Sequence, residues 1–285
     1  MKPQITVCIP AYCTGSVIRR TIESLRCQRF KDFQVLIGIE PPAEELIKIV
    51  QPYLKDQRFI MRVNSERLGW DGNIRQMLLE VDTPFFCILP HDDFIHPDYL
   101  MALYIGHQGF PDASVVYADM HVFGNGRKYN KLLDLPVNGT KAEQVLAFFQ
   151  AGAEAVPWRG VTKTTVIKNT DGFPVDGYMG FAVECEWALS LLGEGRAVRI
   201  PRKLYFKQLH PENITSASKA RLVEQDRERL IQAWQRHRDR MTGLARSIVP
   251  ESDPLFEQVM KSADQAMLDR RLQFIGPEVT QNYLR

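Results

Sequence analysis

Four short apolar runs alternate with three segments of helical periodicity in the first third of this chain, and this alternation restricts the possible folds most. The runs cover residues 5–9, 33–39, 59–63 and 85–89, and the helical patterns between them cover residues 16–25, 46–54 and 71–81. Apolar runs bounded by Pro or polar residues are typical of buried strands. Strands that alternate with helices form βαβ units. We therefore predict an α/β fold with a mostly parallel sheet flanked by helices.

Each predicted strand is followed by a polar or special residue, namely Tyr12, Glu40, Asn64 and Asp92. In a parallel sheet these residues meet at one edge, where open α/β sheets bind their ligands. Asp92 and Asp93 follow the fourth run directly and are well placed for a divalent cation, although an Asp pair can also cap the next helix. The sequence lacks Gly-x-Gly-x-x-Gly and Gly-Lys-Ser/Thr phosphate loops. A dinucleotide-binding Rossmann enzyme and a P-loop enzyme are therefore disfavoured.

Composition indicates an ordinary globular protein and excludes some partners. The 285 residues are 45% hydrophobic and 25% charged, with a formal net charge of +2, which gives no electrostatic case for nucleic acid. The five cysteines lack paired metal-ligand spacing, which indicates a reducing compartment. No secretory pattern precedes the first strand, and no apolar stretch approaches the roughly 20 residues of a membrane span. We expect a cytoplasmic protein whose membrane contact, if it has any, is peripheral.

The pattern changes in the second half of the chain. Asn125-Gly126 is a strong hairpin signal between strands near residues 115–122 and 128–133, and it marks a change to antiparallel pairing. Further on we expect a helix over residues 142–150, strands over 197–201 and 204–207, and a helix that begins near Glu184 and Glu186. Both acids would be favoured by the helix dipole, so helix capping alone can explain them. Long helices over residues 218–248 and 254–274 look like an appendage that packs on the core, dimerises or rests on a membrane; the pattern does not decide among these.

Several separated motifs, in their order and spacing, resemble one family, the inverting glycosyltransferases of family 2 with the GT-A fold. The resemblance covers about residues 4–215. It rests on Val7-Cys8-Ile9-Pro10-Ala11-Tyr12, Leu68-Gly69-Trp70-Asp71-Gly72-Asn73, Pro90-His91-Asp92-Asp93 with Pro97, Gly172-Phe173, Glu184-x-Glu186-Trp187, Pro201, Leu204-Tyr205 and His210-Pro211-Glu212-Asn213. It implies a GT-A domain over residues 1–215, with a nucleotide-sugar half to about 120 and an acceptor half after it. Residues 216–285 would form a helical extension.

The resemblance also implies roles for individual residues. A Mg²⁺ or Mn²⁺ ion would be held by Asp92, with His210 as a second ligand; a lone His-Pro is otherwise usually structural. Glu184 matches the position of the general base, and Glu186 is the fallback. Trp158 and Arg159 would line the acceptor side, although Trp158 also suits a packing role. The nucleotide-sugar would contact Pro10, Ala11, Tyr12, Glu40, Trp70, Asp71, Arg75, His91, Asp92 and Asp93.

Three positions depart from the family pattern. Ile39-Glu40 replaces an Asp-Asp pair that holds the nucleobase, Pro90 replaces the first acid of Asp-x-Asp, and Ile74-Arg75 replaces an Arg-Asn pair. Asp92 would then be the metal ligand, while Asp93 would orient the loop or contact the ribose or donor sugar. Arg75 would either reach the donor or be exposed.

We therefore expect a metal-dependent inverting glycosyltransferase of polysaccharide biosynthesis. Its donor would be a UDP-sugar, with GDP- and dTDP-sugars open, and its acceptor a saccharide, a lipid-linked saccharide or another hydroxyl compound. The C-terminal helices are candidates for a homo-oligomer contact. Two alternatives remain: a nucleotidyltransferase, whose usual Gly-rich signature is missing at Pro10-Ala11-Tyr12-Cys13, and a non-catalytic sugar- or nucleotide-binding module of the same fold.

Overall fold

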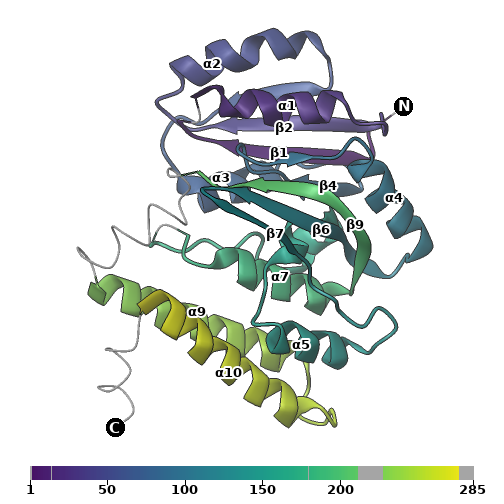
Figure 1. Ribbon diagram of the computed structural model, residues 1–285, viewed down its shortest axis with the longest axis vertical. Helices are drawn as coiled ribbons and strands as arrows, with labels where there is room; N and C mark the ends of the chain where they lie inside the picture. The colour runs from purple at the N-terminus through teal and green to yellow at the C-terminus, as the bar shows by residue number, and fades with distance from the viewer. Residues whose placement is uncertain (1, 14, 179, 211–226, 276–285) are drawn as a thin grey trace.

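A single mixed sheet runs through the computed structural model, which describes residues 2–13, 15–178, 180–210 and 227–275 (Figure 1). Within these residues the strand order is β3-β2-β1-β4-β8-β6-β9-β5, and β7 pairs with β6. The first four strands are parallel and match the predicted apolar runs to within two residues: β1 (Ile5–Ala11), β2 (Phe33–Ile39), β3 (Phe59–Val63) and β4 (Phe85–Ile88). The predicted α/β class with a mixed, mostly parallel sheet is confirmed.

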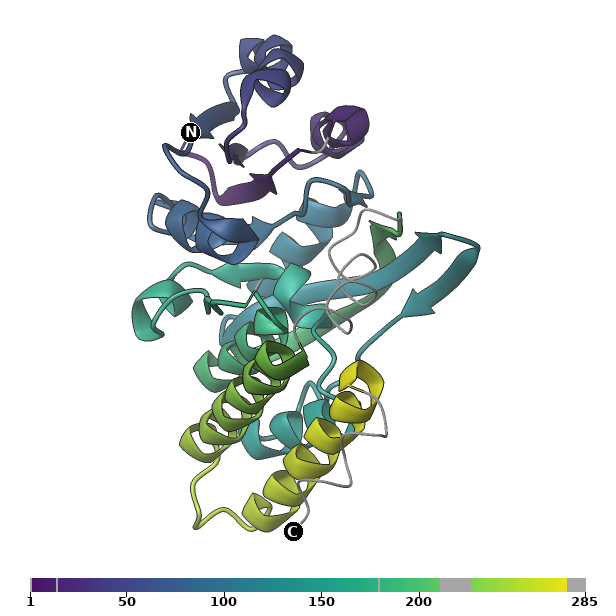
Figure 2. The ribbon, with the colours of Figure 1, turned by 90° about the vertical axis from the view of Figure 1, so that its left-hand side faces the viewer.

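Helices cover both faces of this parallel part. Right-handed crossovers place α1 and α2 on one face and α3 on the other (Figure 2). In α1, four side chains at helical spacing are buried, namely Ile18, Thr21, Ile22 and Leu25. The helical segments here are η1 (Gly15–Val17), α1 (Ile18–Arg26), α2 (Glu44–Val50), η2 (Gln51–Lys55), α3 (Gly69–Leu78) and α4 (Tyr99–Gly109).

The second half of the sheet is mixed. β6 (Ala113–Gly124) and β7 (Arg127–Lys131) form the predicted hairpin, and Asn125 and Gly126 both have the positive φ that a tight hairpin turn requires. The two predicted strands near residues 197–207 form one strand, β9 (Arg196–Gln208), parallel to β6. The pairing shifts register beside Pro201, which has no N–H to donate. Two short strands were not predicted: β5 (Phe94–Ile95) and β8 (Val161–Lys163).

The remaining helices form a layer below this half of the sheet (Figure 1). The segment α5 begins with a capping box between Thr140 and Glu143. The helix α9 packs against α7, and α10 packs against α5 and α9. These segments are α5 (Lys141–Gln150), η3 (Val156–Arg159), α6 (Thr165–Asn169), α7 (Val183–Glu194), α9 (Arg227–Ile248) and α10 (Phe256–Ile275).

The predicted C-terminal helices correspond to α9 and α10. Both pack on the core, which is one of the three arrangements that the sequence left open. Residues 218–226 of the first predicted helix, and residues 211–213 of the predicted closing motif, lie outside the described residues. Among the described helices, none has the length and apolar character needed to cross a membrane.

Candidate active site

Asp92 lies in the loop after β4, where the carboxyl ends of β1 and β4 meet. Its Oδ2 atom is 3.0 Å from His210 Nε2, which donates to it, and both side chains are mostly buried. Burial alone would raise the pKa of Asp92, but the hydrogen bond from His210 and the nearby imidazoles outweigh burial and lower it. Asp92 is therefore held ionised beside an imidazole, a pair of groups that suits a cation–diphosphate complex.

His91, next in the chain, is directed by the first strand. Its Nδ1 atom lies 3.0 Å from the carbonyl oxygen of Pro10. Because a carbonyl only accepts hydrogen bonds, Nδ1 must carry the proton. This bond ties the loop after β4 to the end of β1 and brings the predicted residues Pro10 and His91 together.

Asp93 has the opposite environment and is 2% exposed. Its carboxylate accepts hydrogen bonds from Tyr205 Oη (2.7 Å), from the Gln208 backbone N–H (3.2 Å) and from Arg159 Nε (3.4 Å). Burial, followed by the charge of Asp92, raises the pKa of Asp93. These contacts join β5, β9 and η3 under the site, which supports the predicted loop-orienting role over a contact with the donor.

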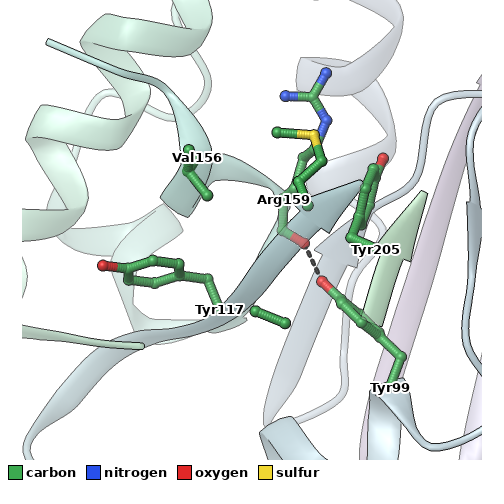
Figure 3. A pocket seen from close by; sticks show the side chains of 7 residues that line it. Tyr99, Tyr117, Val156, Arg159 and Tyr205 are labelled. Carbon is green, nitrogen blue, oxygen red and sulfur yellow. Dashed lines mark hydrogen bonds between the residues drawn. The ribbon is translucent and has the colours of Figure 1, made fainter. Parts of the chain in front are cut away.

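Arg159, in η3, connects this cluster to the second half of the chain. Figure 3 shows its guanidinium and the Tyr205 hydroxyl pointing the same way, while the Arg159 carbonyl oxygen accepts a hydrogen bond from Tyr99. Burial lowers the pKa of Arg159, but its interactions with Tyr205, Asp93 and Glu184 outweigh burial and raise it. Glu184 therefore contributes to the electrostatic environment of Arg159.

Glu184 and Glu186, two residues apart on α7, point to different surroundings. Glu184 lies in the first turn of α7 and is partly exposed. Its side chain forms no hydrogen bond with another of the described residues. Glu186 is buried, with its side chain 1% exposed, and lies 2.7 Å from His237 Nδ1 and 2.8 Å from Arg240 Nε. Of the two predicted bases, only Glu184 is accessible to an acceptor.

Lys207 is a site residue that the sequence patterns did not indicate. It follows Tyr205 by two residues on β9, so both side chains lie on the same face of the strand. The pKa of Lys207 is lowered overall, mainly by burial and then by the charge of Arg159. The carboxylates of Asp93, Glu184 and Asp92 act in the opposite direction. Lys207 is thus electrostatically coupled to all three carboxylates. The alternation of side chains along β9 could have indicated that Lys207 shares a face with Tyr205. It was not used because the strand was predicted as two separate strands.

The predicted donor-side residues lie at the same sheet edge but are partly engaged with one another. Glu40 is buried, and its Oε1 accepts a hydrogen bond from the Leu68 backbone N–H at 2.6 Å. The guanidinium of Arg67 lies 4.0 Å from the Tyr12 ring. Glu40 therefore fixes the loop that brings Arg67 to Tyr12, and a contact of Glu40 with the nucleobase stays a prediction.

The start of α3 contacts the segment that precedes α7. Asp71 is buried and accepts hydrogen bonds from the backbone N–H groups of Gly72 (3.0 Å) and Asp176 (2.9 Å). Trp70 packs edge-on against Trp158 and Phe173. Trp158 is only 5% exposed, which favours the packing alternative for this residue. The predicted donor residue Arg75 is exposed on α3, while Ala11 ends β1 and is buried.

The described residues contain no group of three or more His, Cys, Asp or Glu side chains arranged around a common metal position. Asp92 and His210 are thus a pair of candidate ligands. Such a pair fits Mg²⁺ or Mn²⁺, because these ions are commonly bound by one or two protein groups together with substrate phosphates and water.

Comparison with known proteins places this arrangement in a family. The model of glycosyl transferase family 2 matches residues 6–166, more than half of the chain. A putative glycosyltransferase EpsH of Bacillus subtilis is 22% identical over 78% of this chain and 65% of that protein. A GalNAc(5)-diNAcBac-PP-undecaprenol beta-1,3-glucosyltransferase of Campylobacter jejuni is 25% identical over 43% of this chain and 38% of that protein. The chain spans between 34% and 65% of the curated relatives that it matches.

Solved structures share the fold. S. aureus TarS in complex with UDP-GlcNAc has a TM-score of 0.72 and 16% identity, over 100% of this chain and 76% of that one. A mannosyltransferase of Pyrobaculum calidifontis in complex with GDP-Man and Mn²⁺ has a TM-score of 0.59 and 13% identity, over 96% of this chain and 76% of that one. With the family match and the fold in agreement, the chain belongs to glycosyl transferase family 2.

Proposed function

We propose that the protein transfers a sugar, with inversion, from a nucleotide-sugar donor to a hydroxyl acceptor, and that a UDP-sugar is the first donor to test. The observation that carries this proposal is the Asp92–His210 pair at the sheet edge, next to Asp93 and its partner Arg159. Arg159 and Lys207 are both electrostatically coupled to Glu184. The fold neighbours crystallised with UDP-GlcNAc and with GDP-Man and Mn²⁺ support a nucleotide-sugar donor.

The leaving group is a nucleoside diphosphate, whose negative charge grows as its bond to the sugar breaks. We propose that Asp92 and His210 hold Mg²⁺ or Mn²⁺ against the diphosphate. A bound divalent ion supplies electrostatic stabilisation of that charge. Lys207 and Arg159 add positive charge from the protein on the same side.

Glu184 is proposed as the general base. The acceptor oxygen attacks the anomeric carbon, the bond from that carbon to the diphosphate oxygen breaks, and the hydroxyl proton passes to the Glu184 carboxylate. Attack from the side opposite the leaving group gives inversion.

The other contacts follow from position. We propose that Tyr12 and Arg67 form the wall beside the nucleotide and that Trp70 and His91 line the donor sugar. A cytoplasmic location with peripheral membrane contact agrees with a lipid-linked acceptor, a class that the name of the Campylobacter relative includes.

The experiment has two steps. A set of nucleotide sugars with Mn²⁺ or Mg²⁺ is first screened for release of nucleoside diphosphate, which selects the donor and proves turnover. Glu184→Gln is then expected to lower turnover by about 10²–10⁴-fold with donor affinity nearly unchanged. Asp92→Asn is expected to abolish the metal-dependent part of donor affinity.

Glu194→Gln, at the other end of α7 and paired with Asn169, is the matched control and should behave as wild type. Near-normal turnover in Glu184→Gln would remove Glu184 as the base. Unchanged metal-dependent affinity in Asp92→Asn would refute the metal assignment. Donor binding without any diphosphate release, across the whole set, would favour a non-catalytic binding module.

A further inference from the structure

A cluster of five charged and polar side chains, three of them buried, joins α9 to the segment that leads into α7. The arginines Arg236 and Arg240 both contact the carboxylate of Asp176, at 3.3 Å and 2.8 Å. Arg240 Nε also lies 2.8 Å from Glu186, and His237 Nδ1 lies 2.7 Å from the other oxygen of Glu186. The side chains of Asp176, Glu186 and His237 are each 1% exposed. Three residues on two adjacent turns of α9 therefore hold two acids that are ten residues apart.

The cluster is balanced in charge. Two carboxylates face two guanidinium groups, which leaves no place for a third positive charge. Burial would raise the pKa of Asp176, but the hydrogen bonds from Arg236 and Arg240 outweigh burial and lower it. Burial lowers the pKa of His237, so this imidazole is neutral and donates its Nδ1 proton to Glu186. Buried ionic groups of this kind are costly unless fully paired, and removal of one partner is strongly unfavourable.

The two acids held by α9, Asp176 and Glu186, are both adjacent to the candidate active site. The backbone N–H of Asp176 donates to Asp71 at the start of α3, the helix that carries Trp70. Glu186 follows Glu184 by two residues in the first turn of α7. Between them the chain passes Gly180 and Ala182, which both have positive φ. Positive φ is unfavourable for alanine, so the surrounding contacts must hold this turn.

We propose that α9 is a positioning element of the active site. Arg236, His237 and Arg240 hold segment 176–186 at both ends, and this fixes the direction in which Glu184 projects toward Arg159 and Lys207. The inference rests on the proposed function in taking Glu184 as the base. The C-terminal helix α9 would then be part of the catalytic unit and not an appendage to it.

The test compares neighbouring arginines of the same helix. Arg240→Gln removes the residue that contacts both acids, and Arg238→Gln is the matched control because Arg238 pairs with Asp264 on α10. For Arg240→Gln we expect kcat for diphosphate release to fall about 10- to 100-fold, with the KM for donor within about threefold, after correction for the folded fraction. Arg238→Gln should keep wild-type kcat. Arg240→Lys, which keeps one charge–charge contact, should recover part of the loss.

Arg236→Gln provides a second, milder variant, since its side chain is 46% exposed and contacts only Asp176 of the two acids. It should lower kcat less than Arg240→Gln. Equal kcat losses in the Arg238 and Arg240 variants, or an Arg240→Gln loss that the unfolded fraction fully explains, would overturn the proposal.

A double-variant cycle separates this proposal from the assignment of the base. If α9 acts through Glu184, the Glu184→Gln/Arg240→Gln enzyme should be no slower than Glu184→Gln alone. Multiplicative losses would show that the cluster acts elsewhere and would refute the positioning role. A normal rate in Glu184→Gln alone would instead refute the base and leave the kcat of Arg240→Gln as an independent result.

Discussion

Asp92 and Asp93 are adjacent in sequence, yet their surroundings give them different chemistry. Asp92 pairs with His210, which lowers its pKa, whereas burial raises the pKa of Asp93 beneath the site. Environment, more than residue type, decides which acid of such a pair is available to a ligand. We propose Asp92 as the acid that serves the cation and the diphosphate, whereas Asp93 is engaged in holding β5, β9 and η3 together.

The bond between Tyr205 and Asp93 can be tested alone. Tyr205→Phe deletes the hydroxyl that donates to Asp93 at 2.7 Å and leaves a buried carboxylate with one partner fewer. We expect the free energy of unfolding to fall by about 1–3 kcal/mol, measured by urea denaturation. Tyr129→Phe on β7, where the side chain is exposed, should change it by less than about 0.5 kcal/mol. An equally small change for Tyr205→Phe would contradict the assigned role.

At the scale of elements, the contact between α3 and the segment before α7 depends on one glycine. A Cβ atom at Gly180 would lie 2.4 Å from Trp70 Nε1, and Gly180 has a φ of +67°. Gly180→Ala is therefore expected to displace the Trp70 indole and to lower turnover at least about tenfold, since small misplacements in a site are costly. Steady-state kinetics check this expectation.

Gly177→Ala, three residues earlier in the same turn, is the control. A Cβ atom there meets nothing within 4 Å, so turnover should stay at the wild-type level. If the two alanine variants have the same rate, the packing of Trp70 against this turn does not matter for the reaction.

The elements that could be predicted from sequence are those with a regular local pattern. The first four strands and the helices between them follow apolar periodicity and were placed within a few residues. The strands β5 and β8 have two and three residues, too few to show any period. Pro201 interrupts the apolar pattern of β9, and the pairing with β6 that carries the strand past it is a long-range contact.

The candidate site divides in the same way. The positions of Asp92 after a strand and of Glu184 at a helix start could be predicted because strand ends and helix starts are local features; their roles stay predictions. The burial of Glu186 could not be predicted, because its partners His237 and Arg240 lie on a helix some 50 residues later. Lys207 and the buried state of Trp158 likewise depend on which strands and helices come together in space.

At the scale of the whole molecule, two buried histidines link distant parts of the chain in neutral form. His107 on α4 donates through Nε2 to the Val161 carbonyl of β8, and burial lowers its pKa to about 4. His237 on α9 faces Glu186, Glu184, Arg240 and Arg270, and burial lowers its pKa as well. An unfolded chain releases both imidazoles to an ordinary pKa of about 6.5.

The unfolded state therefore binds more protons than the folded state below about pH 6.5, and the protein loses stability as the pH falls through this range. For His107 alone, the free energy of unfolding should drop by about 2 kcal/mol between pH 8 and pH 5. Carboxylates titrate mainly below this window, so urea denaturation at pH 8, 7, 6 and 5 isolates the imidazoles. His107→Gln and His237→Gln keep a donor for Val161 and Glu186 without a titrating ring, and each should give a flatter pH curve than wild type. Curves that run parallel to wild type would show that these histidines are already protonated in the folded protein.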